Sequence, residues 1–149
     1  FDGSTTEGAG DTNTTALVIQ ALAALGMAGD PMVENGLAYL AAAQAENGGF
    51  PYQPGSAPDA NSTALAVQAI IAAGGDPSSS EWKNAAAALA AFQNESGAFR
   101  YQADQPHDNL FATVQALPAL AGQPLPVLTR GVTPSDGTSV GGATPIGGP

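Results

Sequence analysis

The sequence predicts an all-α fold of helical-hairpin repeats, each about 48 residues long, followed by an irregular tail rich in glycine and proline. Two repeated phrases and the composition lead to this prediction. Hydrophobic residues make up 44% of the 149 residues, and alanine is the commonest among them. Alanine is the best helix former and a poor strand former, so the composition favours closely packed helices over a sheet.

The first repeated phrase runs from Gln44 to Gln53 and returns from Gln93 to Gln102, and we call these segments the landmark loops. The corresponding members are Gln44, Gly48 and Phe50 in the first loop and Gln93, Gly97 and Phe99 in the second. We interpret them as structural: the glutamine binds free backbone groups, the glycines allow a tight turn, and the ring packs beneath it. The interval from Phe1 to Phe50 equals the interval from Phe50 to Phe99, so we expect the chain to begin within a repeat.

The second repeated phrase, which we call the cap phrase, occurs at 11–22 and 59–70, with a weaker third copy at 108–117. All three copies share a glutamine, at Gln20, Gln68 and Gln115. The polar members of the first two copies are Asp11, Asn13, Thr15, Asp59, Asn61 and Thr63. These residue types accept hydrogen bonds from the free N–H groups of a helix's first turn, so we interpret the phrase as helix N-caps. Oxygen ligands for Ca²⁺ are the alternative at the two Asp-x-Asn pairs.

Each repeat reads as an inner helix that is apolar on several sides and an outer helix with a single apolar stripe. The second outer helix is expected to follow Asp76-Pro77, with Ser78 and Glu81 spaced for a capping box and Trp82 on its apolar stripe. Pro118 should kink or shorten the last inner helix. Four of the predicted helices cover about residues 13–25, 31–44, 61–73 and 109–120, and the second outer helix carries a stripe that ends at Phe92. We therefore divide the chain into a repeat domain, 1–121, and a tail or linker, 122–149, rich in Gly, Pro and Thr.

Charge and residue usage exclude several classes of function. With 3 Lys+Arg against 13 Asp+Glu the net charge is −10, so the surface would repel nucleic acids and anionic membrane surfaces, and we expect no nucleic-acid partner. The sequence contains no run of about 18 apolar residues, the length needed to cross a bilayer, so we expect no membrane span in this segment. The chain has no cysteine and 1 histidine, which excludes thiolate catalysis and leaves a Ser-His-Asp triad only around His107.

The two phrases together resemble the α/α-toroid superfamily of terpenoid cyclases and protein prenyltransferase β subunits. The cyclases carry a repeated Gln-to-Gly-x-aromatic signature, and both landmark loops look like it, with Phe50 and Phe99 in place of the usual Trp. The likeness covers roughly residues 1–121. It implies that the repeats form a partial α/α toroid. Since a closed toroid takes about six hairpins, it also implies that other protein chains or missing upstream repeats complete the structure.

The resemblance also bears on catalysis. In squalene–hopene-type cyclases the protonating acid lies in an Asp-x-Asp-Asp-Thr-Ala phrase, which the cap phrase resembles. Here the third and fourth positions are Asn13-Thr14 and Asn61-Ser62, and an amide and a hydroxyl cannot supply a strong acid. The prenyltransferase zinc site needs Asp, Cys and His ligands, which this composition cannot build. We expect no catalytic residue, no metal and no cofactor in this segment.

The cap phrases also look like those of secreted bacterial members of the superfamily. Within the superfamily, these proteins are similar to the cobalamin carriers. We therefore expect a non-catalytic binding or scaffold module at the cell surface or outside the cell of a bacterium, within a longer protein or larger assembly. One alternative is a carrier of a small apolar ligand, either cobalamin-like or isoprenoid. The other is a fragment of an isoprenoid cyclase whose catalytic acid lies upstream.

Overall fold

The computed structural model describes residues 10–126, which form five α-helices and no strand. The all-α prediction is therefore confirmed for this part of the chain. The helices are α1 (Thr12–Ala24), α2 (Pro31–Ala43), α3 (Ala60–Ala72), α4 (Ala85–Ala90) and α5 (Leu110–Leu120). Two sequence predictions, the role of Phe1 and the tail beyond residue 126, lie outside the described residues.

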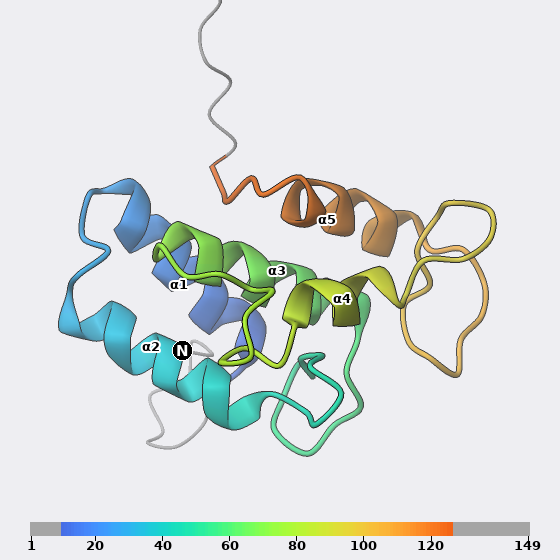
Figure 1. Ribbon diagram of the computed structural model, residues 1–149, viewed down its shortest axis with the longest axis horizontal. Helices are drawn as coiled ribbons and strands as arrows, with labels where there is room; N and C mark the ends of the chain where they lie inside the picture. The colour runs from blue at the N-terminus through green and yellow to red at the C-terminus, as the bar shows by residue number, and fades with distance from the viewer. Residues whose placement is uncertain (1–9, 127–149) are drawn as a thin grey trace, which may run out of the picture.

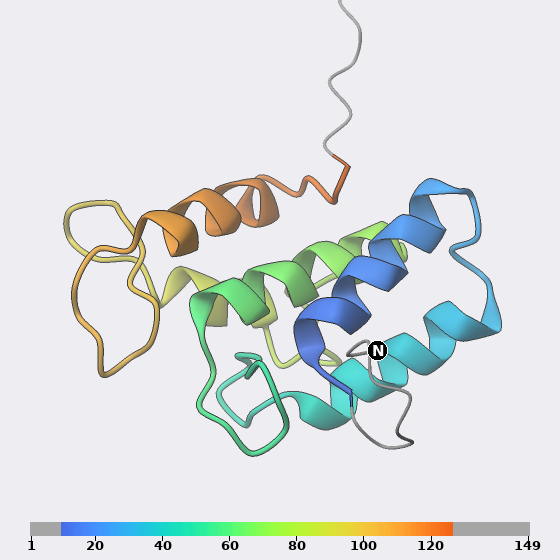
Figure 2. The same cartoon turned by 180° about the vertical axis from the view of Figure 1, so that it is seen from behind.

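Helices α1, α3 and α5 lie side by side, with α3 in the middle (Figures 1 and 2). Helix α2 packs against α1, and α4 packs against α3 and α5. The central helix is consequently enclosed, and from Ala60 to Ile70 only Asn61 is not fully buried. Its alanines allow the neighbouring helices to approach closely, which is how a chain poor in aromatic residues fills its core.

The cap residues explain where the three inner helices begin. Asp11 Oδ1 accepts a hydrogen bond from Thr14 N at 2.7 Å, and Asp59 Oδ1 accepts one from Ser62 N at 2.8 Å. At the start of α5, Asn109 Oδ1 accepts a hydrogen bond from Ala112 N at 3.0 Å. An N-cap side chain satisfies one of the free N–H groups of the first turn, so these positions set the helix starts.

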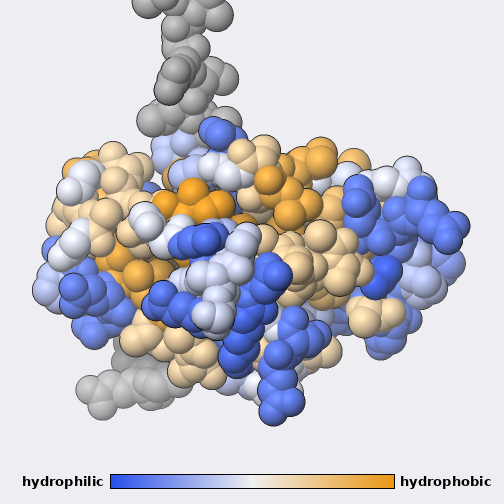
Figure 3. Space-filling model, in the orientation of Figure 1, coloured by the Kyte–Doolittle hydropathy of each residue, from blue (hydrophilic) through white to orange (hydrophobic). Residues whose placement is uncertain are grey.

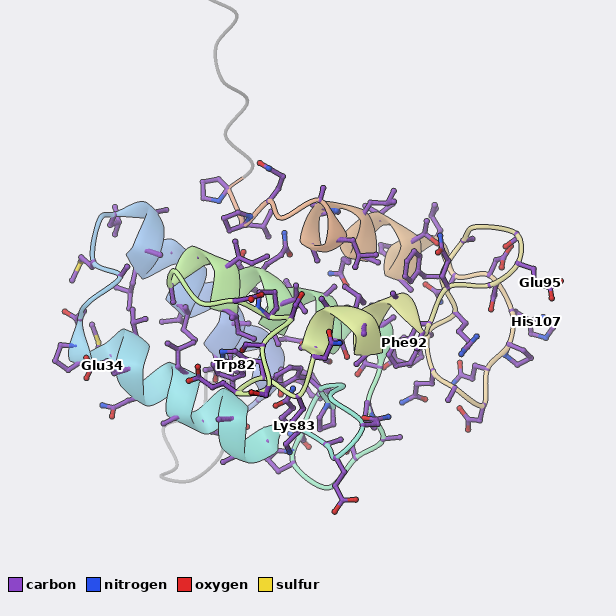
Figure 4. The ribbon with its side chains drawn as sticks, in the orientation of Figure 1. Glu34, Trp82, Lys83, Phe92, Glu95 and His107 are labelled. Atoms are coloured by element: carbon purple, nitrogen blue, oxygen red, sulfur yellow. The ribbon has the colours of Figure 1, made fainter. Side chains whose placement is uncertain are left out.

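The second outer helix, predicted to follow Asp76-Pro77, is present only as α4, which begins at Ala85. Asp76 Oδ1 does accept a hydrogen bond from Ser78 N, but the chain then continues in turns rather than in a helix. Lys83 and Asn84 have φ of 44° and 53°, in the left-handed region, which a continuous right-handed helix cannot accommodate. The predicted capping box is therefore wrong, and Trp82 is buried in a turn before α4 rather than on a helix (Figure 4).

The third copy of the cap phrase also lies in a different register from the one predicted. Thr113 Oγ1 donates a hydrogen bond to Asn109 O at 2.8 Å, as Thr63 Oγ1 does to Asp59 O at 2.7 Å. Asn109 is thus the counterpart of Asp59. Pro118, and not Gln115, then takes the position of the glutamine that the first two copies share. The helix continues to Leu120, two residues past Pro118, and is shorter than α1 and α3.

Candidate functional site

Each landmark loop is bound to the cap phrase that follows it by the same pair of hydrogen bonds. Phe50 N donates to Thr63 Oγ1 at 3.0 Å, and Asp59 N donates to Phe50 O at 3.1 Å. The second loop repeats this with Phe99 N to Thr113 Oγ1 at 2.9 Å and Asn109 N to Phe99 O at 2.8 Å. Both phenylalanine rings are fully buried. The structure therefore brings the two repeated phrases together as a staple between a loop and the next inner helix.

The glutamine of each loop closes the loop itself. Gln44 Nε2 donates to Gly48 O at 2.9 Å, and Gln93 Nε2 donates to Gly97 O at 2.9 Å. Gln44 Nε2 also donates to Trp82 O at 2.7 Å, which ties the first loop to the turn that precedes α4. Both glutamines thus bind a carbonyl group within their own loop, and Gln44 also binds one in the turn before α4, rather than those at the end of their own helix.

The tyrosine of each landmark loop reaches back to the preceding inner helix. Tyr52 O accepts a hydrogen bond from Thr12 N at 2.9 Å, and Tyr101 O accepts one from Ala60 N at 2.9 Å. The first amide of α1 is therefore satisfied by the loop that follows α2, and the first amide of α3 by the loop that follows α4. The equivalent amide of α5 is Leu110 N, for which no acceptor exists among residues 10–126.

Asp59 is the acidic residue of the second cap phrase, and its side chain is buried. Its Oδ1 accepts from Ser62 N and its Oδ2 accepts from Ser62 Oγ, both at 2.8 Å. Burial raises the pKa of Asp59, and the hydrogen bonds from Ser62 oppose that rise. Burial, followed by the charge of Asp59, raises the pKa of Tyr101. Both oxygens of the carboxylate are already used to cap α3, which is a structural task.

Asn13 and Asn61 occupy the third position of the cap phrase. Their side-chain Oδ1 atoms are buried and have no hydrogen-bond partner among the described residues. An amide has no acidic proton near neutral pH, so neither residue can protonate a substrate. Thr63, by contrast, uses its hydroxyl fully in the staple with Phe50.

The raised pKa of Asp59 predicts a pH effect on stability. The folded state takes up the proton at higher pH than the unfolded chain, so lowering the pH from 7 toward the ordinary value of 3.8 stabilises the fold through this group. Asp59→Asn keeps a good N-cap and should remove this gain in pH-dependent thermal unfolding. Asp108→Asn is the matched control. Hydrogen bonds from Asn94 and Ser96 lower the pKa of Asp108, so its contribution is lost on acidification. Equal pH profiles for the two variants would contradict this assignment.

Gln20 and Gln68 have a structural role that the sequence did not predict. Both are about 1% exposed. Leu125 N donates to Gln20 Oε1 at 2.6 Å, and Gln68 Nε2 donates to Gln123 O at 2.7 Å. The segment after α5 is thus held across α1 and α3. The available signal was a glutamine at the same position in two otherwise apolar helices, since a buried amide needs hydrogen-bond partners.

Gln20→Leu is expected to release Leu125. Removing the acceptor of one hydrogen bond, worth about 1 kcal/mol, should speed hydrogen exchange of the Leu125 amide about five-fold in NMR spectra. Gln115→Leu is the control, because Gln115 makes no hydrogen bond to residues 123–125. Exchange that is equally fast in the two variants would show that Gln20 does not hold the segment.

Among the described residues, no group of three or more His, Cys, Asp or Glu side chains is placed to hold a metal ion. Glu95 and His107 lie at the outer edge of the loops, away from the helices (Figure 4). None of the described helices is long and apolar enough to cross a bilayer.

A hollow on the surface is lined by Thr15, Met32, Asn35, Gly36 and Tyr39. Its volume of about 200 Å³ is below the roughly 300–1,000 Å³ of ordinary ligand sites.

Comparison with protein-family models, with curated proteins and with solved structures finds no match to this chain.

Proposed function

We propose that this chain is a non-catalytic binding or scaffold module, that its repeats form part of an α/α toroid, and that it binds another protein segment through α5. The observation that carries the proposal is the outer face of α5. Leu110, Phe111, Val114 and Leu117 are 76%, 74%, 58% and 57% exposed. The helix contains no charged residue, and Figure 3 shows hydrophobic residues at the surface along it. A contiguous apolar surface of this kind marks an interaction site.

The repeated hydrogen bonds support the toroid part of the proposal. The same staple and the same tyrosine contact join successive hairpins, and the inner helices form one layer with outer helices packed against it. The absence of an acid at Asn13 and Asn61 supports a non-catalytic role. The likeness of the cap phrases to secreted bacterial proteins supports a location at the cell surface or outside the cell.

Photo-crosslinking in the producing cell tests this function. A benzoylphenylalanine placed at Phe111 should form an adduct with a protein segment on irradiation, which mass spectrometry identifies. The same group at Glu34, an exposed position on α2, is the matched control and should give no specific adduct. Adducts from both positions alike, or from neither, would contradict the proposal. A defined small molecule extracted with the native protein would instead favour the carrier.

A further inference from the structure

We infer that the segment that covers α5 is a further helical hairpin of the same design as those in this chain, with its own landmark-type loop. The inference rests on the proposed function, because it names the partner of the α5 face. It follows from three observations. Several apolar positions of α5 are exposed, the Leu110 amide has no acceptor among residues 10–126, and the tyrosine carbonyl groups of both landmark loops are already hydrogen-bonded.

The open positions of α5 are covered positions in α3. With Asn109 as the counterpart of Asp59, the exposed Leu110, Val114 and Leu117 correspond in α3 to Ala60, Ala64 and Val67, which are at most 1% exposed. In α3 the face concerned lies within the core that α4 and α5 complete. The positions that neighbouring helices cover on α3 are thus exposed on α5.

The free amide points to the same occupant. Leu110 N is the third member of a series in which Thr12 N is bonded to Tyr52 O and Ala60 N to Tyr101 O. In both earlier members the acceptor belongs to the landmark loop that comes after the next outer helix, α2 for Tyr52 and α4 for Tyr101. A helix alone would cover the apolar side chains of α5, whereas a hairpin with such a loop would also supply the carbonyl that Leu110 N lacks.

The packing of α5 against α3 indicates which side chains the segment that covers α5 should present. Helix α5 buries an alanine stripe, Ala112, Ala116 and Ala119. The occupant should likewise present small residues, since the open face of α5 carries large ones. A second copy of this chain fits these conditions less well, because the two landmark loops that carry Tyr52 O and Tyr101 O already lie against its own α1 and α3, to which they are hydrogen-bonded. The occupant is therefore a different repeat, with a free loop carbonyl.

An extended chain tests the inference. The extended chain consists of residues 1–126, which keep Gln123 and Leu125 bound to Gln68 and Gln20, followed by a second copy of 75–149. It places one more outer helix, landmark loop and inner helix after the original α5. Docking should slow hydrogen exchange of the original Leu110 amide by about ten-fold or more and raise the Tm relative to the unextended chain. The matched control carries Ala116→Glu in the added copy only, which places a charge against the apolar face and should restore fast exchange.

Three results would overturn the inference. The first is an added repeat that folds while the Leu110 amide stays fast, and the second is an added repeat that remains unfolded despite the open face beside it. The third is self-association of the unextended chain through α5 in sedimentation experiments, with Leu110 protected, which would make a second copy the occupant. The two proposals fail separately. A protein adduct at Phe111 whose partner segment is not a helical hairpin would leave the binding function standing and reject this inference.

Discussion

Phe50→Ala is expected to lower the free energy of unfolding by about 3–5 kcal/mol, the range for truncating a fully buried phenylalanine. The ring is 0% exposed and lies at the staple that joins the first landmark loop to α3. Its loss leaves a cavity that the backbone hydrogen bonds on both sides prevent from collapsing. Urea unfolding followed by far-UV circular dichroism measures the change.

The chain provides its own control for this prediction. Phe111→Ala makes the same chemical change at a side chain that is 74% exposed, so its cost in the isolated chain should stay within about 0.5 kcal/mol. If the two substitutions cost the same, either the first landmark loop does not hold the core or the α5 face is not open.

After Phe50→Ala, Gly48→Ala is expected to cause the second largest loss in the free energy of unfolding. Gly48 has a φ of +84°, and an added Cβ would lie 2.5 Å from the backbone carbonyl oxygen of Lys83. Left-handed backbone costs a residue with a Cβ about 1–2 kcal/mol, and the forced overlap adds about 1–3 kcal/mol because neither backbone segment can move freely. The expected total is about 2–5 kcal/mol, measured as the shift in the urea midpoint.

Gly97→Ala separates the two contributions. Gly97 has nearly the same φ, +87°, but nothing lies within 4 Å of its added Cβ, so only the backbone cost of about 1–2 kcal/mol should appear. A Gly97 variant as unstable as the Gly48 variant would show that the contact with the turn before α4 is unimportant.

The sequence allowed accurate prediction where local chemistry decides the structure. Helices α1, α2 and α3 lie within a residue of their predicted bounds, because Asp11, Asp30 and Asp59 are N-caps whose effect is confined to one turn. The all-α class likewise follows from the alanine content and the repeat period.

Prediction failed where contacts between repeats decide the structure. Helix α4 begins late because Lys83 and Asn84 adopt left-handed conformations beside Gly48, in a turn whose carbonyl at Trp82 is bound by Gln44. No short-range signal encodes that contact. The Asp76-Pro77 start resembled the Asp30-Pro31 start of α2, so local reasoning assigned both the same outcome.

The cap phrase of α5 shows the limit of matching by residue identity. Aligning Gln115 with Gln20 and Gln68 placed the phrase one turn out of step, whereas the hydrogen bonds of Thr113 fix the register. The open face of α5 and the free Leu110 amide could be recognised only after this register was known. The role of Gln20 and Gln68 likewise needed the path of the chain after α5.

The most direct test compares hydrogen exchange at the first amide of each inner helix in the isolated chain, measured by NMR. Thr12 N and Ala60 N are bonded to tyrosine carbonyl groups of the two landmark loops, whereas Leu110 N has no acceptor among residues 10–126. We predict slow exchange at Thr12 and Ala60 and exchange close to that of an unstructured peptide at Leu110. A Leu110 amide as slow as that of Ala60 in the monomer would contradict an interface left open at α5.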